Sequence, residues 1–261
     1  MNQKKHYYLI HIQYLGFRFH GWAKQPGLKT IHLMIDKTIN FILEHDRFKT
    51  MGTSRTDAMV SANHSAFELF MNEPIKDIEL FFQDFNLNLP SDIKALKIEE
   101  VDANFNIINS SEYKKYTYLF SYGEKQHPFS SSLMCNIQDN LDIAQMKIAA
   151  ELFKGTHNFK NYCTRPTEGK NYQRTILESY IEENKTYQAN FFPEKSFIYT
   201  VKGKGFLRNQ VRLMMGQLIS IGKNESSLEY LKTSLVTPHQ KQLNYIAPAS
   251  GLILDEIKFN I

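Results

Sequence analysis

The sequence predicts an α+β protein, with strands gathered into a sheet and helices packed against it. Three observations support this class: the length, the composition, and segments of strand and helix periodicity that follow one another along the chain. With 261 residues, the chain has room for one large domain or two small ones. Hydrophobic residues make up 42% and charged residues 22%, which is typical of globular proteins and excludes disorder for most of the length.

The first part of the chain combines four strand patterns with two helix patterns. Residues of high strand propensity predict strands over 5–13, 48–53, 65–70 and 93–101. An apolar stripe that follows Thr30, a good N-cap residue, predicts a helix over 31–44. A second helix is predicted over 77–85, ended by Asn88-Leu89-Pro90. Between the first strand and helix, Gly16–Pro26 is predicted to be a loop with an aromatic, cationic centre.

The second part repeats a similar order of elements. Strands are predicted over 113–122, 174–183, 196–202 and 252–259, and helices over 142–153 and 207–221. The order strand, helix, strands, helix, strand therefore occurs twice, although the two parts share no visible sequence match. We expect two α/β halves, residues 1–106 and 107–261.

The cellular setting follows from what the chain lacks. No apolar run approaches the roughly 18 residues of a membrane helix. The N-terminus has no long apolar segment of the kind found in a secretory signal. The two cysteines, Cys135 and Cys163, are expected to be reduced thiols, and no Cys-x-x-Cys metal site is present. We expect a cytoplasmic protein without a membrane partner or a bound metal.

The distribution of charge is more informative than the net charge of +4. Three stretches contain basic residues and no acid: residues 1–35, 152–167 and 201–224. Aromatic residues, 13% of the chain, lie close to these cations. Cations neutralise phosphates and aromatic rings stack on unpaired bases, so the pattern favours an RNA partner.

Two sets of residues in this background suggest chemistry. Asp57 lies in the segment Ser-Arg-Thr-Asp-Ala, where an aspartate is commonly a turn cap. Arg55, two residues earlier, shares a side with Asp57 if the segment is extended. Arg208 and Arg212 are four apart in the predicted last helix and would share a face. Such arginines are either solvated or paired with a buried carboxylate, which they keep ionised.

An aromatic strand gives a further candidate. Tyr116 and Tyr118 alternate on one face of the strand predicted over 113–122. They form either a core aromatic pair or a platform on which a base stacks. No local pair of carboxylates, nucleophilic triad, phosphate-binding loop or dinucleotide glycine motif accompanies these residues.

Six segments, in order, resemble the tRNA pseudouridine synthase A family over most of the chain. The first has the pattern Gly-x-x-aromatic-x-Gly-Trp-x-x-Gln, and the second has the family's Arg-Thr-Asp-Ala core. The six segments are Gly16–Gln25, Ser54–Ala58, Asn88–Ile93, Lys115–Tyr118, Phe206–Arg212 and Ala247–Leu254. One such segment is weak support, but six in the right order are specific.

The resemblance implies a pseudouridine synthase fold, in which one long, mostly antiparallel sheet crosses two similar α/β halves with a central cleft. It implies a homodimer that isomerises uridine to pseudouridine, without a cofactor, in the anticodon stem-loop of tRNA at positions 38 to 40. Asp57 matches the essential aspartate, which attacks the sugar or the base or abstracts a ribose proton.

The resemblance also assigns the other site residues. Arg212 matches the arginine that pairs with the aspartate, Tyr116 the tyrosine that packs against the target base, and Arg55 the arginine that holds the nucleotide out of the helix. The same segments carry further substrate-binding candidates: Arg18, Lys24, Lys115, Arg208 and Leu207.

Several positions depart from the family pattern. Ser54 and Met59 replace glycines, so if those glycines have positive φ, either these residues are strained or the loop differs. Ser61 replaces a histidine, and the family's Phe-His-Ala-Arg is here Phe105-Asn106-Ile107-Ile108. Two alternatives therefore stand beside tRNA modification: a pseudouridine synthase with a different RNA target, and an RNA-binding protein without catalysis.

Overall fold

A computed structural model describes residues 5–237, 243 and 245–260. The chain forms two compact units: residues up to Glu112 together with those from Leu254 onward (the N-terminal unit), and Tyr113–Ile253 (the C-terminal unit). The domain division into 1–106 and 107–261 stays a prediction. Across the described part of the chain, no helix combines the length and apolar character needed to cross a membrane.

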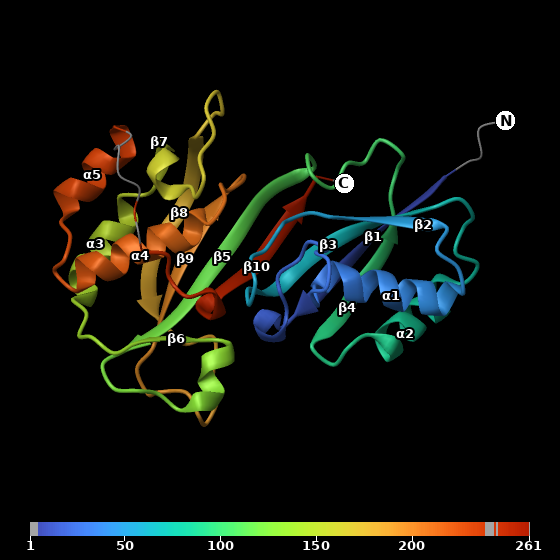
Figure 1. Cartoon of the computed structure of the whole chain (residues 1–261), viewed down its shortest axis with the longest axis horizontal. Coiled ribbons are helices and arrows are strands. Elements are labelled where there is room, and N and C mark those ends of the chain that lie inside the picture. Colours follow the sequence, from blue (N-terminus) through green and yellow to red (C-terminus); the bar gives the residue numbers. More distant parts are fainter. Residues whose placement is uncertain (1–4, 238–242, 244, 261) are drawn as a thin grey trace. The chain divides into compact units, whose positions relative to one another are not determined.

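The N-terminal unit is a sheet with two helices (Figure 1). Its elements are β1 (His6–Tyr14), α1 (Ile31–Leu43), β2 (Phe48–Gly52), β3 (Ser61–Met71), α2 (Ile78–Asn88), β4 (Ile93–Glu100) and β10 (Leu252–Phe259). The strand order is β4-β1-β3-β10, and β2 also pairs with β3. The β1–β3, β1–β4 and β2–β3 pairs are antiparallel. The first loop, Gly16–Gln25, lies between β1 and α1, and the Asp57 loop, residues 53–60, connects β2 to β3.

The two faces of this sheet differ in what covers them. Alternation places Tyr8, Ile10 and Phe67 on one face, where they are fully buried. Helix α2 lies on this face, since Phe85 stacks edge-on against Phe67. The register places Leu9 opposite Glu68 on the other face, where Ile107 of the β4–β5 connection packs against Leu9.

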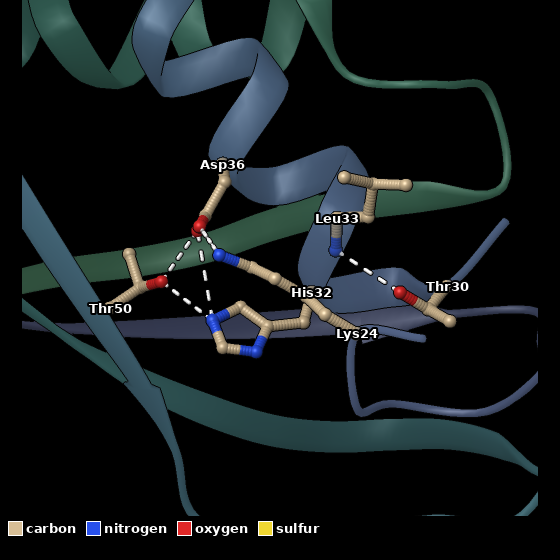
Figure 2. Close-up of polar contacts among 6 residues, drawn as sticks. All are labelled: Lys24, Thr30, His32, Leu33, Asp36 and Thr50. Atoms are coloured by element: carbon tan, nitrogen blue, oxygen red, sulfur yellow. Dashed lines mark hydrogen bonds and ion pairs between the residues drawn. The ribbon is translucent and has the colours of Figure 1, made fainter. Parts of the chain in front are cut away.

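Helix α1 lies on the same face as α2. The Thr30 hydroxyl caps its N-terminus by accepting from the Leu33 N–H at 3.3 Å. Figure 2 shows how its polar side binds the sheet: the Thr50 hydroxyl of β2 donates to Asp36, and His32 Nε2 lies 2.7 Å from the Thr50 Oγ1. Burial lowers the pKa of His32. The helix ends at Leu43, as Glu44 adopts a left-handed conformation.

The C-terminal unit contains the remaining strands of the 10-stranded sheet and three helices (Figure 1). Its elements are β5 (Ser111–Tyr122), β6 (Cys135–Ile137), α3 (Ile143–Glu151), β7 (Gly155–Asn158), β8 (Gln173–Glu183), β9 (Phe197–Gly203), α4 (Gln210–Gly222) and α5 (Leu228–Val236). The antiparallel order is β5-β9-β8-β7, and β6 is parallel to β5. Short 3-10 helices occur at Gly16–Arg18, Pro128–Ser132, Lys160–Tyr162 and Ala249–Gly251. Cys135 and Cys163 are free and buried.

The α+β class is confirmed, with two kinds of difference. Strands β6 and β7 and helix α5 were not predicted. The two strands have three and four residues, which are too few to display a period. The predicted helix over 207–221 begins at Gln210, because Asn209 has φ of 58° and cannot continue a right-handed helix. Arg208 therefore precedes α4, and the prediction that it shares a helix face with Arg212 is wrong.

The left-handed end of α1 gives a test of local strain. A non-glycine residue in this conformation costs about 1 kcal/mol, so we expect Glu44→Gly to raise the free energy of unfolding by about 0.5–1 kcal/mol. Lys37→Gly, an exposed position inside the same helix, should lower it by about 1 kcal/mol. Urea denaturation measures both, and equal losses in the two variants would contradict the assignment.

Candidate active site

The Asp57 loop is held by the backbone of the first loop. The Trp22 N–H donates to the Thr56 carbonyl at 3.1 Å, and the Met59 N–H donates to the Phe19 carbonyl at 3.0 Å. Main-chain bonds on both sides of Asp57 therefore locate its Cα. The side chain is half-buried, whereas Arg55 on the same loop is exposed.

Glycines make this close approach between the loops possible. Gly21 has φ of 86°, and a Cβ there would lie 2.6 Å from the Thr56 carbonyl oxygen. A Cβ on Gly16 would lie 1.9 Å from the Val60 carbonyl oxygen. Both distances are shorter than any real contact, so the Gly-x-x-aromatic-x-Gly spacing of the first loop is required by packing against the Asp57 loop.

The first loop is in turn fixed by the start of α1 and the end of β2. The Ile31 N–H donates to the Gly21 carbonyl and the His32 N–H to the Trp22 carbonyl, both at 3.1 Å. The Trp22 ring is 3% exposed, stacks on His32, and leaves no room for a Cβ on Gly52. The position of Asp57 therefore depends on a chain of contacts from α1 through the first loop.

The residues in and next to the Asp57 loop that differ from the family pattern are accommodated in different ways. Met59 has φ of 68°, so the backbone strain expected there is present. Ser54 does not have a positive φ, so it is free of that strain. Ser61 is buried, and its Oγ accepts from the Gly16 N–H at 2.9 Å. The hydroxyl that stands in place of an imidazole is thus part of the contact between the two loops.

Two predicted substrate-binding cations of the first loop are paired within the N-terminal unit. Arg18 binds Asp92 through Nε at 2.8 Å and Nη2 at 2.7 Å. Lys24 forms an ion pair with Asp36 of α1 (Figure 2). Their side chains remain 59% and 47% exposed. Both cations therefore anchor the first loop while their outer surfaces stay open to solvent.

In the C-terminal unit the two tyrosines of β5 have different surroundings. Tyr118 is fully buried and donates to the Pro248 carbonyl at 2.8 Å, and burial raises the pKa of its hydroxyl. Tyr116 is partly exposed, and its ring stands at 87° to Phe206 with centroids 5.2 Å apart. Tyr118 is thus a core residue, whereas Tyr116 has a partly exposed ring that packs against Phe206, which suits a stacking platform.

Arg212 lies in the first turn of α4, half-buried, and its Nε donates to the Ala247 carbonyl at 2.7 Å. The Ala247 N–H donates back to the Arg212 carbonyl at 3.1 Å. A Cβ on Gly216, one helical turn later, would lie 2.1 Å from the Tyr245 carbonyl oxygen, so the backbone of Tyr245 lies directly against α4. These contacts fix the plane of the guanidinium group.

The remaining candidates surround the start of α4 and the strand β5. Leu207 is buried, and its N–H donates to Gln210 Oε1 at 2.8 Å, while Arg208 is exposed. Lys115 pairs in register with Lys202 of β9. Lys114, on the same strand face as Tyr116, is largely buried, and desolvation lowers its pKa to about 8.

The predicted site residues thus fall into two groups. Asp57, Arg55, Arg18 and Lys24 belong to the N-terminal unit, and Tyr116, Lys115, Leu207, Arg208 and Arg212 to the C-terminal unit. Sequence reasoning did not identify the positioning residues Gly16, Gly21, Ser61 and Ala247, although three of them stand inside the matched segments. Among the described residues, no cluster of three or more His, Cys, Asp or Glu side chains could hold a metal ion.

Comparison with known proteins gives matches over nearly the whole chain. Residues 149–260 match a family model described as tRNA pseudouridine synthase. The tRNA pseudouridine synthase A of Dictyoglomus thermophilum is 32% identical over 252 residues, which cover 96% of this chain and 98% of that protein. The proteins of the same name from Clostridium botulinum and Staphylococcus saprophyticus are 30% and 31% identical, over 94% and 95% of this chain and 96% and 89% of theirs.

The contact between the two loops leads to a stability prediction. Gly21→Ala places a methyl group 2.6 Å from the Thr56 carbonyl, whereas a Cβ on Gly27, also at positive φ, meets nothing within 4 Å. We expect Gly27→Ala to cost about 1 kcal/mol and Gly21→Ala about 3 kcal/mol. Thermal unfolding compares Gly27→Ala, which adds backbone strain alone, with Gly21→Ala, which adds strain and a clash. Equal losses of stability would refute the close contact between Gly21 and Thr56.

The buried lysine leads to a second prediction. Lys114→Met removes a desolvated cation and should raise the free energy of unfolding at pH 7 by about 1–3 kcal/mol. The folded pKa of about 8 lies below the ordinary 10.5, so the unfolded wild type binds more protons between these values. Wild-type stability therefore rises with pH across this window, and the advantage of the variant should shrink. A constant difference from pH 7 to 10.5 would contradict the lowered pKa.

Proposed function

Because this chain belongs to the tRNA pseudouridine synthase A family, it is an isomerase, and we propose that it converts uridine to pseudouridine in the anticodon stem-loop of tRNA, at positions 38 to 40. The observation that carries the proposal is the geometry around Asp57. The aspartate of the matched Arg-Thr-Asp segment is held from both sides by the backbone of the matched first loop.

The reaction explains why such rigid placement is useful. The bond between uracil N1 and ribose C1′ breaks, the base turns, and a bond forms between C5 and C1′. The C5 proton leaves and N1 gains one, so atoms and electrons balance without a redox partner, and we propose that no cofactor takes part. The detached base must be held and water excluded until the new bond forms.

We assign Asp57 as the catalytic carboxylate, which attacks the sugar or the base or abstracts a ribose proton. The resemblance implies that Arg212 pairs with it in a cleft between two similar halves. A guanidinium group beside a carboxylate stabilises the charged form and so keeps it reactive. The bond from Arg212 Nε to Ala247 supports this role, because it orients the arginine independently of substrate.

The other residues are assigned to RNA binding. Removing a base from its stack costs a few kcal/mol, which an aromatic platform and a cation in the vacated place offset. Tyr116, backed by Phe206, is the proposed platform, and the exposed Arg55 is the proposed replacement for the base. Phosphate contacts are assigned to the cations Arg18, Lys24, Lys115 and Arg208, with Leu207 beside them.

The assembly and location follow the family as well. We propose a homodimer that acts in the cytoplasm, one tRNA contacting both subunits. A second candidate, the same reaction on a different RNA, is favoured by the altered loop at Met59 and Ser61 and by Ile108 in place of an arginine. A binder without catalysis is disfavoured by the retained Asp57 and Arg212.

Release of tritium from tRNA labelled at uracil C5 tests the reaction directly. Wild type should release label, and Asp57→Ala should lose about 100-fold or more in rate. Arg212→Ala should lose most activity, because the unpaired carboxylate takes up a proton more readily. Glu73→Ala removes an exposed carboxylate of the same unit and should behave as wild type. Near-normal turnover by Asp57→Ala or Arg212→Ala would refute the assigned role.

The position is tested with transcripts in which the uridines at 38, 39 and 40 are replaced by cytidine. Loss of release with the triple replacement places the reaction in the anticodon arm. Release that persists would instead support the second candidate, a different RNA site.

A further inference from the structure

A cavity of about 610 Å³ lies on the sheet face of the N-terminal unit opposite α1 and α2. Residues of β1, β2 and β3 form it, together with Phe105 and its neighbours in the β4–β5 connection. The volume is in the range of small-molecule sites. Asp57 and the first loop are absent from its lining, so the proposed chemistry leaves this cavity without a role.

One wall of the cavity is aromatic. Tyr7 of β1 and Phe70 of β3 pair in register, with their rings 5.6 Å apart at 77°. Phe105 also lines the cavity and packs edge-on against Phe259. Half-buried rings in this arrangement leave apolar area for a planar ligand, such as a nucleobase, to contact.

Cationic side chains also line the cavity. Lys5, Arg47 and Lys49 line the cavity and are exposed, against one exposed carboxylate, that of Asp46. The Lys49 ammonium lies 5.8 Å from the centre of the Phe70 ring, so a positive charge adjoins the aromatic surface. A nucleotide carries both a planar base and a phosphate, so it would engage the rings and the cations at once.

The least exposed of the lining residues carries a carboxyl group. Glu68 is 1% exposed; its Oε2 accepts from the Ile107 N–H at 3.4 Å, and its Oε1 has no hydrogen-bond partner. Burial raises the pKa of Glu68, which reduces the negative charge that a phosphate would meet. The unpartnered oxygen retains the capacity to accept a hydrogen bond, such as one from an N–H group of a base.

We propose that this cavity binds one unpaired nucleotide of the RNA substrate, its base against Tyr7 and Phe70 and its phosphate on Arg47 and Lys49. The inference rests on the proposed function, in that the ligand is a residue of RNA. It adds a contact surface on the sheet face opposite α1 and α2.

The test separates binding from turnover. In the Asp57→Ala background, fluorescence anisotropy with labelled tRNA measures affinity from 50 to 200 mM salt. The pair Arg47→Gln and Lys49→Gln, made together, should weaken binding about 10-fold and flatten the slope of log affinity against log salt by about one, as expected for one to two lost phosphate contacts. Lys37→Gln, an exposed lysine on α1, is the matched control and should change neither.

A second variant blocks the cavity without removing charge. Ala103 is exposed on its rim, and Ala103→Trp should weaken tRNA binding about 10-fold while the salt slope stays as in wild type. With Asp57 present, both variants should raise KM and leave kcat unchanged. Wild-type affinity and slope in both variants would overturn the inference. Absence of turnover in the wild type, with tRNA binding weakened in the variants as expected, would refute only the proposed function.

The source of the nucleotide is resolved by titrating free UMP and AMP. Weak or absent binding of the mononucleotides, together with weakened tRNA binding by the variants, supports a nucleotide within RNA. Mononucleotide binding that is tight and lost in the Arg47, Lys49 variant would overturn the RNA assignment in favour of a free nucleotide.

Discussion

The backbone contact between the first loop and the Asp57 loop is the constraint on which the site in the N-terminal unit depends. Two main-chain hydrogen bonds hold Thr56 and Met59, on either side of the aspartate. Such bonds need the two backbones to approach without side chains between them, which glycines at 16 and 21 permit. The first loop cannot shift alone, since its carbonyls accept from the first N–H groups of α1. If Asp57 is the catalytic carboxylate, as we propose, its backbone needs no reorganisation when substrate arrives.

The C-terminal unit uses the same principle for its arginine. Reciprocal bonds link Arg212 and Ala247, and Gly216 lets the chain at Tyr245 lie directly on α4. In the N-terminal unit, main-chain hydrogen bonds hold a loop in place. In the C-terminal unit, they hold a long, flexible side chain. This explains why the matched segments contain so many small residues beside the few that carry chemistry.

Two basic residues of the first loop form ion pairs within the N-terminal unit, so they have a structural role besides any contact with RNA. Arg18 and Lys24, which sequence reasoning assigned to substrate, are held by Asp92 and Asp36. Their pairs fix the first loop, so a loss of activity on their removal has two sources: weaker phosphate binding and displacement of Asp57. A change confined to the salt dependence of binding would indicate the first source, and a lower kcat the second.

The sequence by itself determined the α+β class and most strand and helix positions, because apolar periodicity is a local property. Its short ordered motifs also singled out Asp57, Arg212 and Tyr116 as candidate site residues. Only the tertiary structure decided which tyrosine of β5 is core, that α4 begins after Asn209, and that Ser61 bonds Gly16. It also decided that Met59 is strained and Ser54 is not. Each of these depends on a backbone dihedral angle or on a partner far along the chain, and residue spacing carries no record of either.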